Sequence, residues 1–298
     1  MATAEAAVRG PYWTVLVPVA VAVLGGALFF WPMLISGRNL TPQDVRERMA
    51  GLSAPPESAS VDLDRLSFGA KAIEQLARRS RNGERAFVEL CALLPANAQH
   101  QNPLVRRAVA RAMGEAAWDD GYLPALHRML ADEDELVQRL AAESLAAWER
   151  MEGREILLRS LEPRVVVSPY SGRLIAGLEK DVRINRSGQL AFIEIAGKER
   201  KKVFAPITGY VASMLKSGSE VEKGQKLAVL LPGVGQVWRA LRGLYLVGQT
   251  VDIDRIETAL KDRHGLGRDV YRQRSETIEM IEERARRGIK VGRIKIGG

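Results

Sequence analysis

Residues 205–233 read APITGYVASMLKSGSEVEKGQKLAVLLPG and repeat a pattern that first starts at Ser168 with SPYSGRLIAGLEKDVRINRSGQLAFIEI. Each copy alternates apolar and polar residues over short runs, with glycines where tight turns need a positive φ. The duplication predicts two β halves that close around one shared core. The matched positions are Pro169 with Pro206, Gly172 with Gly209, and SGQLAFI at 187–193 with KGQKLAV at 223–229.

The duplicated segment, residues 163–233, resembles the barrel-sandwich hybrid of biotinyl and lipoyl domains. Its second half carries the signature of that superfamily, A-P-x-x-G-x-V followed by G-x-x-V-x-K-G-Q-x-L-A. The same module occurs in the HlyD-like membrane fusion proteins, which are periplasmic adaptor subunits of efflux pumps and type I secretion systems. The resemblance therefore implies a barrel-sandwich hybrid domain over residues 163–233.

The resemblance to carrier domains directs attention to Lys198. Their modified lysine lies at the hairpin between the two halves, about seven residues before the A-P pair, and counting back from Ala205 gives Lys198. Biotin domains have A-M-K-M there and lipoyl domains have D-K-A, whereas Gly197 and Glu199 flank this lysine. Because a ligase must recognise that tip, we expect no attached cofactor. A biotin- or lipoyl-type carrier modified at Lys198 is the alternative.

The join between the two halves differs from that of the fusion proteins. Those proteins usually place a long coiled-coil hairpin between the half-motifs, to reach an outer-membrane channel. Here about ten residues, AGKERKKVFA, join the halves. The resemblance thus supports a membrane-anchored module with this β core, without channel docking through such a hairpin.

A helical pattern with a period of 32 residues precedes the β segment. NPLVRRAVARAMGEAAW starts at Asn102 and DELVQRLAAESLAAW at Asp134, and apolar residues at i, i+4 and i+8 predict one buried stripe in each helix. The second helices of the repeats open at Gly121 and Gly153. The superposed positions are Val105 with Val137, Val109 with Ala141 and Met113 with Leu145, and Ile73 takes the valine position of an earlier copy.

Residues 65–162 resemble the short HEAT-like repeats, whose signature is D-x-x-V-R-x-x-A-A-x-x-L. Gln138 replaces the usual arginine after the valine, and the connection at 83–102 is longer than the period. A related pattern returns in residues 234–298, where VWRALRGLYLVG at 237–248 and VYRQRSETIEMIEER at 270–284 are offset by 33. The expected fold class is therefore α+β, with HEAT-like α-repeats flanking an inserted β domain.

The N-terminal segment has the pattern of a transmembrane helix. Residues 10–37 contain no charged side chain, with Trp13 and Trp31 near the two ends. As a helix they would span about 42 Å, against about 30 Å of hydrocarbon. We therefore predict a retained single-pass anchor at residues 1–38, in contact with the lipid bilayer through 10–37, followed by a juxtamembrane segment and linker at 39–64.

The orientation of the anchor is not fixed by charge. Arg9 precedes the apolar segment, while Arg38, Arg46 and Arg48 follow it, which by the positive-inside rule favours a cytoplasmic bulk. The resemblance to fusion proteins favours the periplasm, and we adopt that expectation, with the protein in the inner membrane.

Composition argues against several function classes. The net charge of +8 is spread along the chain, and the basic run KERKK at 198–202 lacks aromatic neighbours for base stacking, so we expect no nucleic-acid partner. Cys91 lies in an apolar helical pattern and is expected to be a buried thiol. The three histidines, His100, His127 and His264, have no carboxylates at metal-ligand spacing. We therefore expect no metal site, no catalytic residues and no enzymatic activity.

These observations lead to one expected function. The protein is expected to be a non-catalytic adaptor or assembly subunit of a bacterial envelope complex, with a transporter as one candidate. Its partners would be other envelope or transporter proteins, with self-association into a homo-oligomer also compatible with the sequence. The concave face of the repeats and the two turns of the β module are the candidate contact surfaces.

Overall fold

The computed structural model describes residues 40–52, 59–195, 199–261, 263, 265–289 and 291. The predicted anchor at 1–38 and the predicted attachment residue Lys198 lie outside the described residues. Within the described part of the chain, no helix is both long and apolar enough to cross a bilayer.

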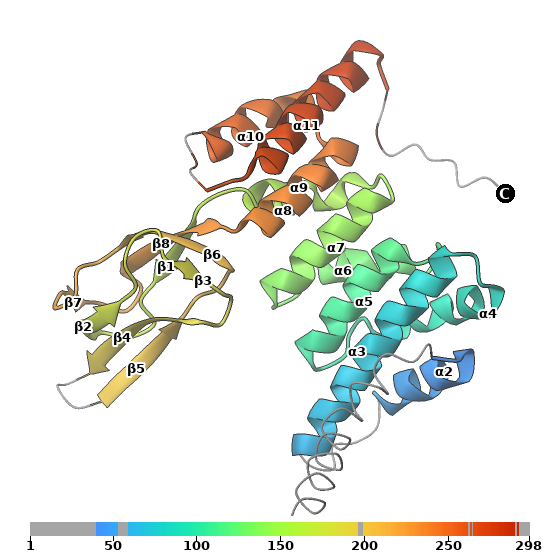
Figure 1. The fold of residues 1–298 in the computed structure, drawn as a ribbon, viewed down its shortest axis with the longest axis horizontal. Coiled ribbons are helices and arrows are strands. Elements are labelled where there is room, and N and C mark those ends of the chain that lie inside the picture. Colours follow the sequence, from blue (N-terminus) through green and yellow to red (C-terminus); the bar gives the residue numbers. More distant parts are fainter. Residues whose placement is uncertain are drawn as a thin grey trace, which may run out of the picture.

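The described chain has a mixed α and β fold, in which a stack of helices carries a module of two antiparallel sheets (Figure 1). Five helices form the stack, each packing on the next. They are α3 (Ala59–Arg81), α5 (Pro103–Glu115), α7 (Glu135–Ala147), α9 (Val234–Val247) and α11 (Arg268–Arg286). Shorter elements alternate with them along the chain: α2 (Pro42–Gly51), α4 (Arg85–Val88), η1 (Glu89–Leu93), η2 (Pro95–Asn97), α6 (Tyr122–Met129), η3 (Met151–Gly153), α8 (Arg154–Arg159), η4 (Thr250–Asp252) and α10 (Ile253–Leu260).

The predicted apolar stripes form the core of the stack. The superposed positions of the three copies are all fully buried: Ile73, Val105, Val109, Met113, Val137, Ala141 and Leu145. The corresponding valines of α9 and α11 are Val237 and Val270, and both are buried in a second core cluster. Helix α7 contributes Ala142 and Ala146 to this cluster. Gly121 and Gly153 are the N-cap residues of α6 and α8, as their spacing predicts.

The stack starts earlier than the sequence suggests. Residues 39–64, expected to be a juxtamembrane segment and linker, include α2 and the first residues of α3. Thr41 and Asp44 form a capping box at the start of α2. Val45 and Met49 are buried in the same core cluster as α3, α5 and α7. The sequence predicts the N-cap of α2. It does not predict that α2 packs on the stack, because the helix is short and has few apolar residues.

The β module has the internal symmetry that the duplication predicts. Its sheets have the strand orders β1-β8-β6-β3 and β5-β4-β2-β7, and exchanging each strand for its counterpart in the other half converts one order into the other. The strands are β1 (Arg164–Val167), β2 (Gly172–Gly177), β3 (Arg183–Ile184), β4 (Gln189–Ile195), β5 (Glu199–Phe204), β6 (Gly209–Met214), β7 (Glu220–Val221) and β8 (Lys226–Pro232).

The structural register corrects one part of the sequence alignment. Counterpart strands are related by a shift of 37 residues, so that buried Leu190 of β4 corresponds to buried Leu227 of β8. The motif match of 187–193 with 223–229 is therefore wrong by one residue, because it aligns Gly188 with Gly224. The turn instead places Ser187 and Gly224 at equivalent positions, and both have a positive φ.

Gly172 and Gly209 are equivalent for a steric reason. A Cβ on Gly172 would lie 2.2 Å from the carbonyl oxygen of Glu194, and a Cβ on Gly209 would lie 1.9 Å from that of Leu231. In both halves a neighbouring strand therefore approaches so closely that only glycine fits. This explains why the same spacing from proline to glycine recurs in the two copies.

The β module is an insertion into a continuous helical stack. The chain leaves the stack after α8, builds the module around a core of its own, and re-enters at α9. Helix α9 packs directly on α7 and α8, where a Cβ on Gly243 would lie 2.7 Å from Leu157 Cδ1 and 3.5 Å from Ala146 Cβ. The module consequently projects from the side of the stack, without separating its two parts (Figure 1).

Candidate functional site

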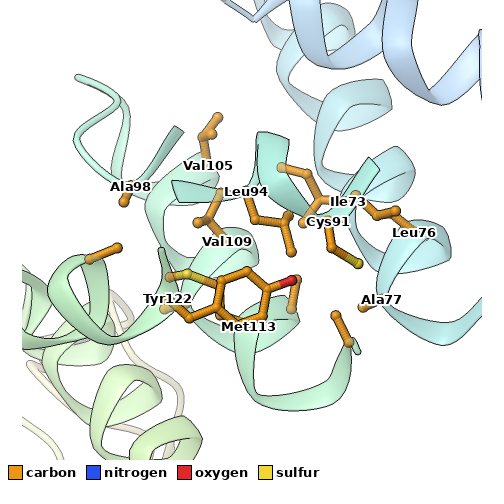
Figure 2. Close-up of a cluster of buried hydrophobic side chains, with 14 of the residues drawn as sticks. Ile73, Leu76, Ala77, Cys91, Leu94, Ala98, Val105, Val109, Met113 and Tyr122 are labelled. Atoms are coloured by element: carbon orange, nitrogen blue, oxygen red, sulfur yellow. The ribbon is translucent and has the colours of Figure 1, made fainter. Parts of the chain in front are cut away.

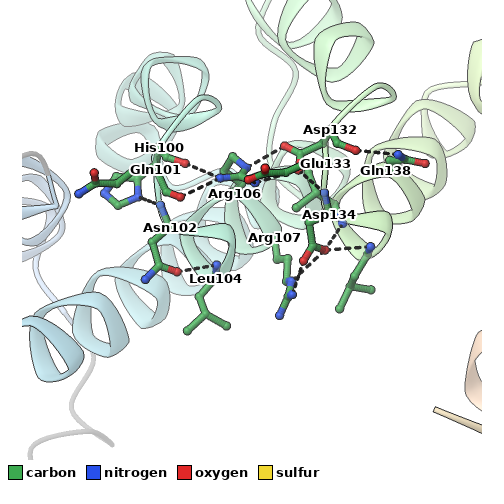
Figure 3. A network of polar contacts seen from close by, with 12 residues as sticks. His100, Gln101, Asn102, Leu104, Arg106, Arg107, Asp132, Glu133, Asp134 and Gln138 are labelled. Carbon is green, nitrogen blue, oxygen red and sulfur yellow. Dashed lines mark hydrogen bonds and ion pairs between the residues drawn. The ribbon is translucent and has the colours of Figure 1, made fainter. Parts of the chain in front are cut away.

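The turns that start α5 and α7 contain the same hydrogen bonds, 32 residues apart (Figure 3). The Asn102 backbone N–H donates to His100 Nδ1 at 2.9 Å, and the Asp134 N–H donates to Asp132 Oδ1 at 2.8 Å. Side-chain oxygens of Asn102 and Asp134 each cap their helix by accepting from the backbone N–H two residues further on, at 2.9 Å. The repeat period thus extends to the polar turns.

Arginines of α5 connect one turn to the next (Figure 3). Arg106 donates from Nε and Nη2 to the Asp132 carboxylate at 2.7 and 2.9 Å. Arg107 donates from Nε to Asp134 Oδ1 at 3.2 Å. Gln138, which follows Arg106 by one period, donates to the Asp132 carbonyl at 2.6 Å instead. The α7 residues one period after Arg106 and Arg107 are Gln138 and Arg139. Of these two, only Arg139 can donate to the next turn as an arginine.

Asp134 joins the helical stack to the β module. Besides capping α7 and accepting from Arg107, its Oδ2 accepts from Arg186 Nη2 at 2.9 Å. Burial opposes ionisation of this carboxyl, but the hydrogen bonds from Arg107 and Arg186 outweigh it and hold its pKa well below the usual range. Asp134 is therefore a fixed negative charge at the junction.

The series changes at the next step, from α7 to α9. The N-cap of α9 is Gly233, so no side chain caps this helix. Arg139 donates instead to the neutral amide oxygen of Gln236. Its Nε lies 3.4 Å from Glu143 Oε1, and Arg239 Nε lies 3.4 Å from the other oxygen of Glu143. The carboxylate of Glu143 thus faces two guanidinium groups. The turn before α7 has a capping carboxylate, that of Asp134, whereas the turn before α9 has none.

Burial perturbs the pKa values of Arg139 and Glu143. It lowers the pKa of Arg139 to about 10, with nearby Arg239, Arg186 and Arg111 acting in the same direction and Glu143 against it. Burial also raises the pKa of Glu143, against the attraction of the arginines. Within the described residues, Arg139 Nε and Arg186 Nη1 are buried without a hydrogen-bond partner. Glu143 Oε1 is likewise buried without a hydrogen-bond partner in this part of the chain. The junction therefore has more guanidinium groups than carboxylates, and Arg186 Nη1 is an unused donor among the described residues.

A cleft of about 760 Å³ opens at this junction. Its walls come from the start of α7, the end of α8, the β3 and β6 region of the module and the first residues of α9. We call it the arginine cleft, after six of its lining residues: Arg139, Arg159, Arg164, Arg183, Arg186 and Arg239. The acidic lining residues are Glu135 and Glu162, and each already has an arginine partner, Arg164 and Arg255 respectively.

The β module is held to the stack at the arginine cleft and at a second place. Arg186 and Arg164 bind Asp134 and Glu135 at the start of α7. On another side, buried Arg263 donates from Nη2 to the carbonyl of Pro232, at the end of β8, at 2.6 Å. These contacts, together with the short connections to α8 and α9, fix the orientation of the module on the stack.

The sequence-predicted sites fall elsewhere. Residues 196–198, with Lys198, lie outside the described residues, between the paired ends of β4 and β5 at Ile195 and Glu199. Cys91 is a buried free thiol, as expected. His100 belongs to the turn before α5, and His127 Nε2 lies 3.2 Å from a Glu152 oxygen. In the part of the chain that the structure describes, no three His, Cys, Asp or Glu residues gather as metal ligands.

No continuous sequence motif predicts the arginine cleft, because its residues are far apart in the chain. Arg186 and Asp134 are 52 residues apart, and Arg139 and Gln236 are 97 apart. The individual arginines look like ordinary exposed positions of helices and strands. The single hint is that Arg107, Arg139 and Arg239 each follow a core valine by two residues, at Val105, Val137 and Val237.

Comparison with known proteins identifies the repeats. Residues 70–167 match the family model of HEAT repeats, which confirms the HEAT-like repeats predicted from the sequence. No curated protein matches the chain significantly. Among solved structures, one similar chain is a single-chain, multi-domain long-chain acyl-CoA carboxylase, 15% identical, with a TM-score of 0.22. The match covers 24% of this chain and 7% of the carboxylase, and at that level it carries no assignment of activity.

Proposed function

We propose that this protein is a non-catalytic, membrane-anchored adaptor or assembly subunit of a bacterial envelope complex. The observation that supports this most is the fixed insertion of the β module in an unbroken helical stack. HEAT repeats form extended surfaces for protein contact. A second module held rigidly beside such a surface gives two binding faces in a constant relation, as a scaffold requires.

The finer features of the proposal come from the sequence. The anchor at residues 10–37 would tether the protein to the inner membrane, with the bulk of the chain in the periplasm. The β module would have the barrel-sandwich hybrid fold of the HlyD-like fusion proteins. The exchange symmetry of its two sheets supports that fold, because each half of the duplication contributes to both sheets.

Affinity purification from detergent-solubilised membranes tests the adaptor role. We expect the full chain to recover at least one stoichiometric partner, and a variant without residues 164–232 to recover less of it. Topology reporters fused after residue 298 should report a periplasmic C-terminus. Recovery of no stoichiometric partner by the full chain would contradict the adaptor role, whereas a cytoplasmic reporter signal would contradict the orientation alone.

A biotin- or lipoyl-type carrier modified at Lys198 is the second candidate. It is favoured by the pairing of Ile195 with Glu199, because Lys198 then belongs to the short link between the paired strands β4 and β5. Intact-mass measurement on the chain, purified from a host with its own ligases, separates the two functions. We expect the unmodified mass, with Lys198→Arg as the matched control. An added biotinyl or lipoyl mass that is lost in the variant would establish the carrier.

A further inference from the structure

We propose that the arginine cleft binds an acidic peptide segment of a partner protein. The inference rests on the proposed adaptor function and names the chemistry of the partner. Between α5 and α7, Arg107 donates to the capping carboxylate of Asp134. Between α7 and α9, the equivalent residue is Arg139, which donates to the neutral amide of Gln236. The cap of α9 is Gly233, which has no side chain to accept from it.

An external carboxylate would complete the interrupted series. The guanidinium group presents a planar fork of donors that matches a carboxylate, and such charge-assisted pairs are the stronger hydrogen bonds of proteins. Arg186 Nη1 is buried and has no hydrogen-bond partner among the described residues. Arg139 Nε forms an ion pair with Glu143 Oε1 at 3.4 Å, but neither atom has a hydrogen-bond partner in the described part of the chain. Burial without a partner is costly for a charged donor, so a bound carboxylate would relieve it.

The charge balance of the cleft has the sign that this partner requires. Six arginines line it against two glutamates, and both glutamates have arginine partners. Four of the six arginines also have carboxylate partners: Arg164 pairs with Glu135, Arg186 with Asp134, and Arg139 and Arg239 share Glu143. Arg159 and Arg183 are exposed at the cleft, and neither has an ion pair within the described residues. They are therefore available for further acidic side chains of the same segment.

The remaining lining favours a peptide over a nucleic acid. Apolar side chains accompany the arginines, among them Leu136, Ile156, Ile207 and Val234, and they suit the uncharged residues of an extended segment. Tyr210 is the single aromatic residue of the lining. Single-stranded nucleic acid is usually held by several stacked rings along a basic groove. The cleft volume of about 760 Å³ is sufficient for a few residues of peptide.

Fluorescence anisotropy of the full chain in detergent micelles tests the proposal. The ligand is a labelled hexapeptide that alternates glutamate with alanine, and its matched control has glutamine in place of glutamate. The cleft variant is Arg159→Gln with Arg183→Gln, which changes exposed residues outside the contacts that hold the module. The control variant, Arg81→Gln with Arg128→Gln, removes the same charge from exposed positions of α3 and α6.

We expect the glutamate peptide to bind and the glutamine peptide not to bind. The cleft variant should bind the glutamate peptide about tenfold more weakly, and the control variant within about twofold of the unchanged chain. Equal weakening in both variants would show a general charge effect and overturn the proposal. So would displacement of the peptide by submillimolar inorganic phosphate, which indicates a small-anion site, or tighter binding of a labelled oligothymidine.

The outcomes separate this inference from the adaptor role itself. If the membrane purification recovers a partner while the glutamate peptide does not bind, the cleft assignment fails and the adaptor role stands. If the peptide binds with the expected dependence on Arg159 and Arg183 while no partner is recovered, the adaptor role fails and the cleft remains an acidic-peptide site.

Discussion

Arg186 of the β module donates from Nη2 to Asp134 Oδ2 of the helical stack at 2.9 Å, and the same carboxylate caps α7. The side chain of Asp134 is 10% exposed, so this pair is shielded from solvent more than most surface ion pairs. One side chain thus links the start of a repeat helix, the preceding helix and the inserted module. The orientation of the module depends on this carboxylate.

The variant Asp134→Asn should lower the free energy of unfolding by about 2 kcal/mol at pH 7, because hydrogen bonds to charged groups are worth about 1.5–3 kcal/mol. Asparagine caps helices as well as aspartate does, so the loss reports on the charge and not on the cap. Chemical denaturation measures it. A variant within about 0.3 kcal/mol of the unchanged chain would show that Arg107 and Arg186 do not depend on this carboxylate.

The same variant should show a defined pH dependence. Asp134 has a lower pKa in the folded protein than in the unfolded chain, so its contribution is complete above the unfolded value of about 3.9 and is lost as the pH falls through the folded value. The difference between the two proteins should therefore stay constant from about pH 7 to pH 5 and shrink below about pH 4. A difference that already shrinks between pH 7 and pH 6 would contradict the assignment.

Tyr122 should tolerate the loss of its hydroxyl. The ring of Tyr122, the first residue of α6, is fully buried in the cluster with Cys91 and Met113 (Figure 2). It also packs against Trp118, with ring centroids 5.9 Å apart. Its hydroxyl has no hydrogen-bond partner among the described residues, and the nearby Cys91 Sγ donates to the Phe87 carbonyl. A buried polar group without a partner costs about 1–3 kcal/mol.

We therefore expect Tyr122→Phe to leave the thermal unfolding temperature unchanged or to raise it. Tyr122→Ala is the comparison variant and should lose about 3–5 kcal/mol, as other large-to-small changes of buried aromatic residues do. Calorimetry of the two variants measures the difference. A loss of more than about 1 kcal/mol in Tyr122→Phe would mean that the hydroxyl has a bonding partner in solution.

The contact of α9 with α7 and α8 should be sensitive to side-chain size at one glycine. A Cβ on Gly243 would lie 2.7 Å from Leu157 Cδ1, whereas a Cβ on Gly235, in the same helix, would meet only Arg239 Nη1 at 3.8 Å. Gly243→Leu should lower the free energy of unfolding by about 1–3 kcal/mol through overpacking. Gly235→Leu, the matched control, should change it by less than about 0.5 kcal/mol. Equal effects would show that α9 does not pack closely there.

The periodic parts of this fold could be predicted from the sequence. The valine positions at 105, 137, 237 and 270 recur with helical neighbours, and all four are buried. Gly172 and Gly209 mark the two β halves because each permits a close strand approach. In both cases a local steric or packing requirement leaves a residue type at a fixed spacing, and the sequence therefore records it.

Other parts depend on information that the sequence does not display locally. The sequence predicts that AGKERKKVFA only joins the two halves, but its residues Glu199–Phe204 form the strand β5. It lies at the edge of its sheet, pairing only with β4, and charged residues are common on edge strands. The register of β4 was misjudged by one residue because the motif alignment followed Gly188, while the positive φ belongs to Ser187. The arginine cleft is lined by residues from five segments of the chain. These segments come together only when α9 packs on α7, so the sequence does not show the cleft locally.

The continuity of the helical stack can be tested by replacing residues 165–231 with a short glycine-serine linker. If the β module is an insertion in one continuous stack, the shortened chain should keep its helical circular dichroism and unfold in a single transition. Residues 234–286 should then resist trypsin as they do in the full chain, because α9 still packs on α7 and α8. Rapid proteolysis of 234–286 with survival of 63–160 would contradict the account, since the C-terminal helices would then depend on the module and not on the stack.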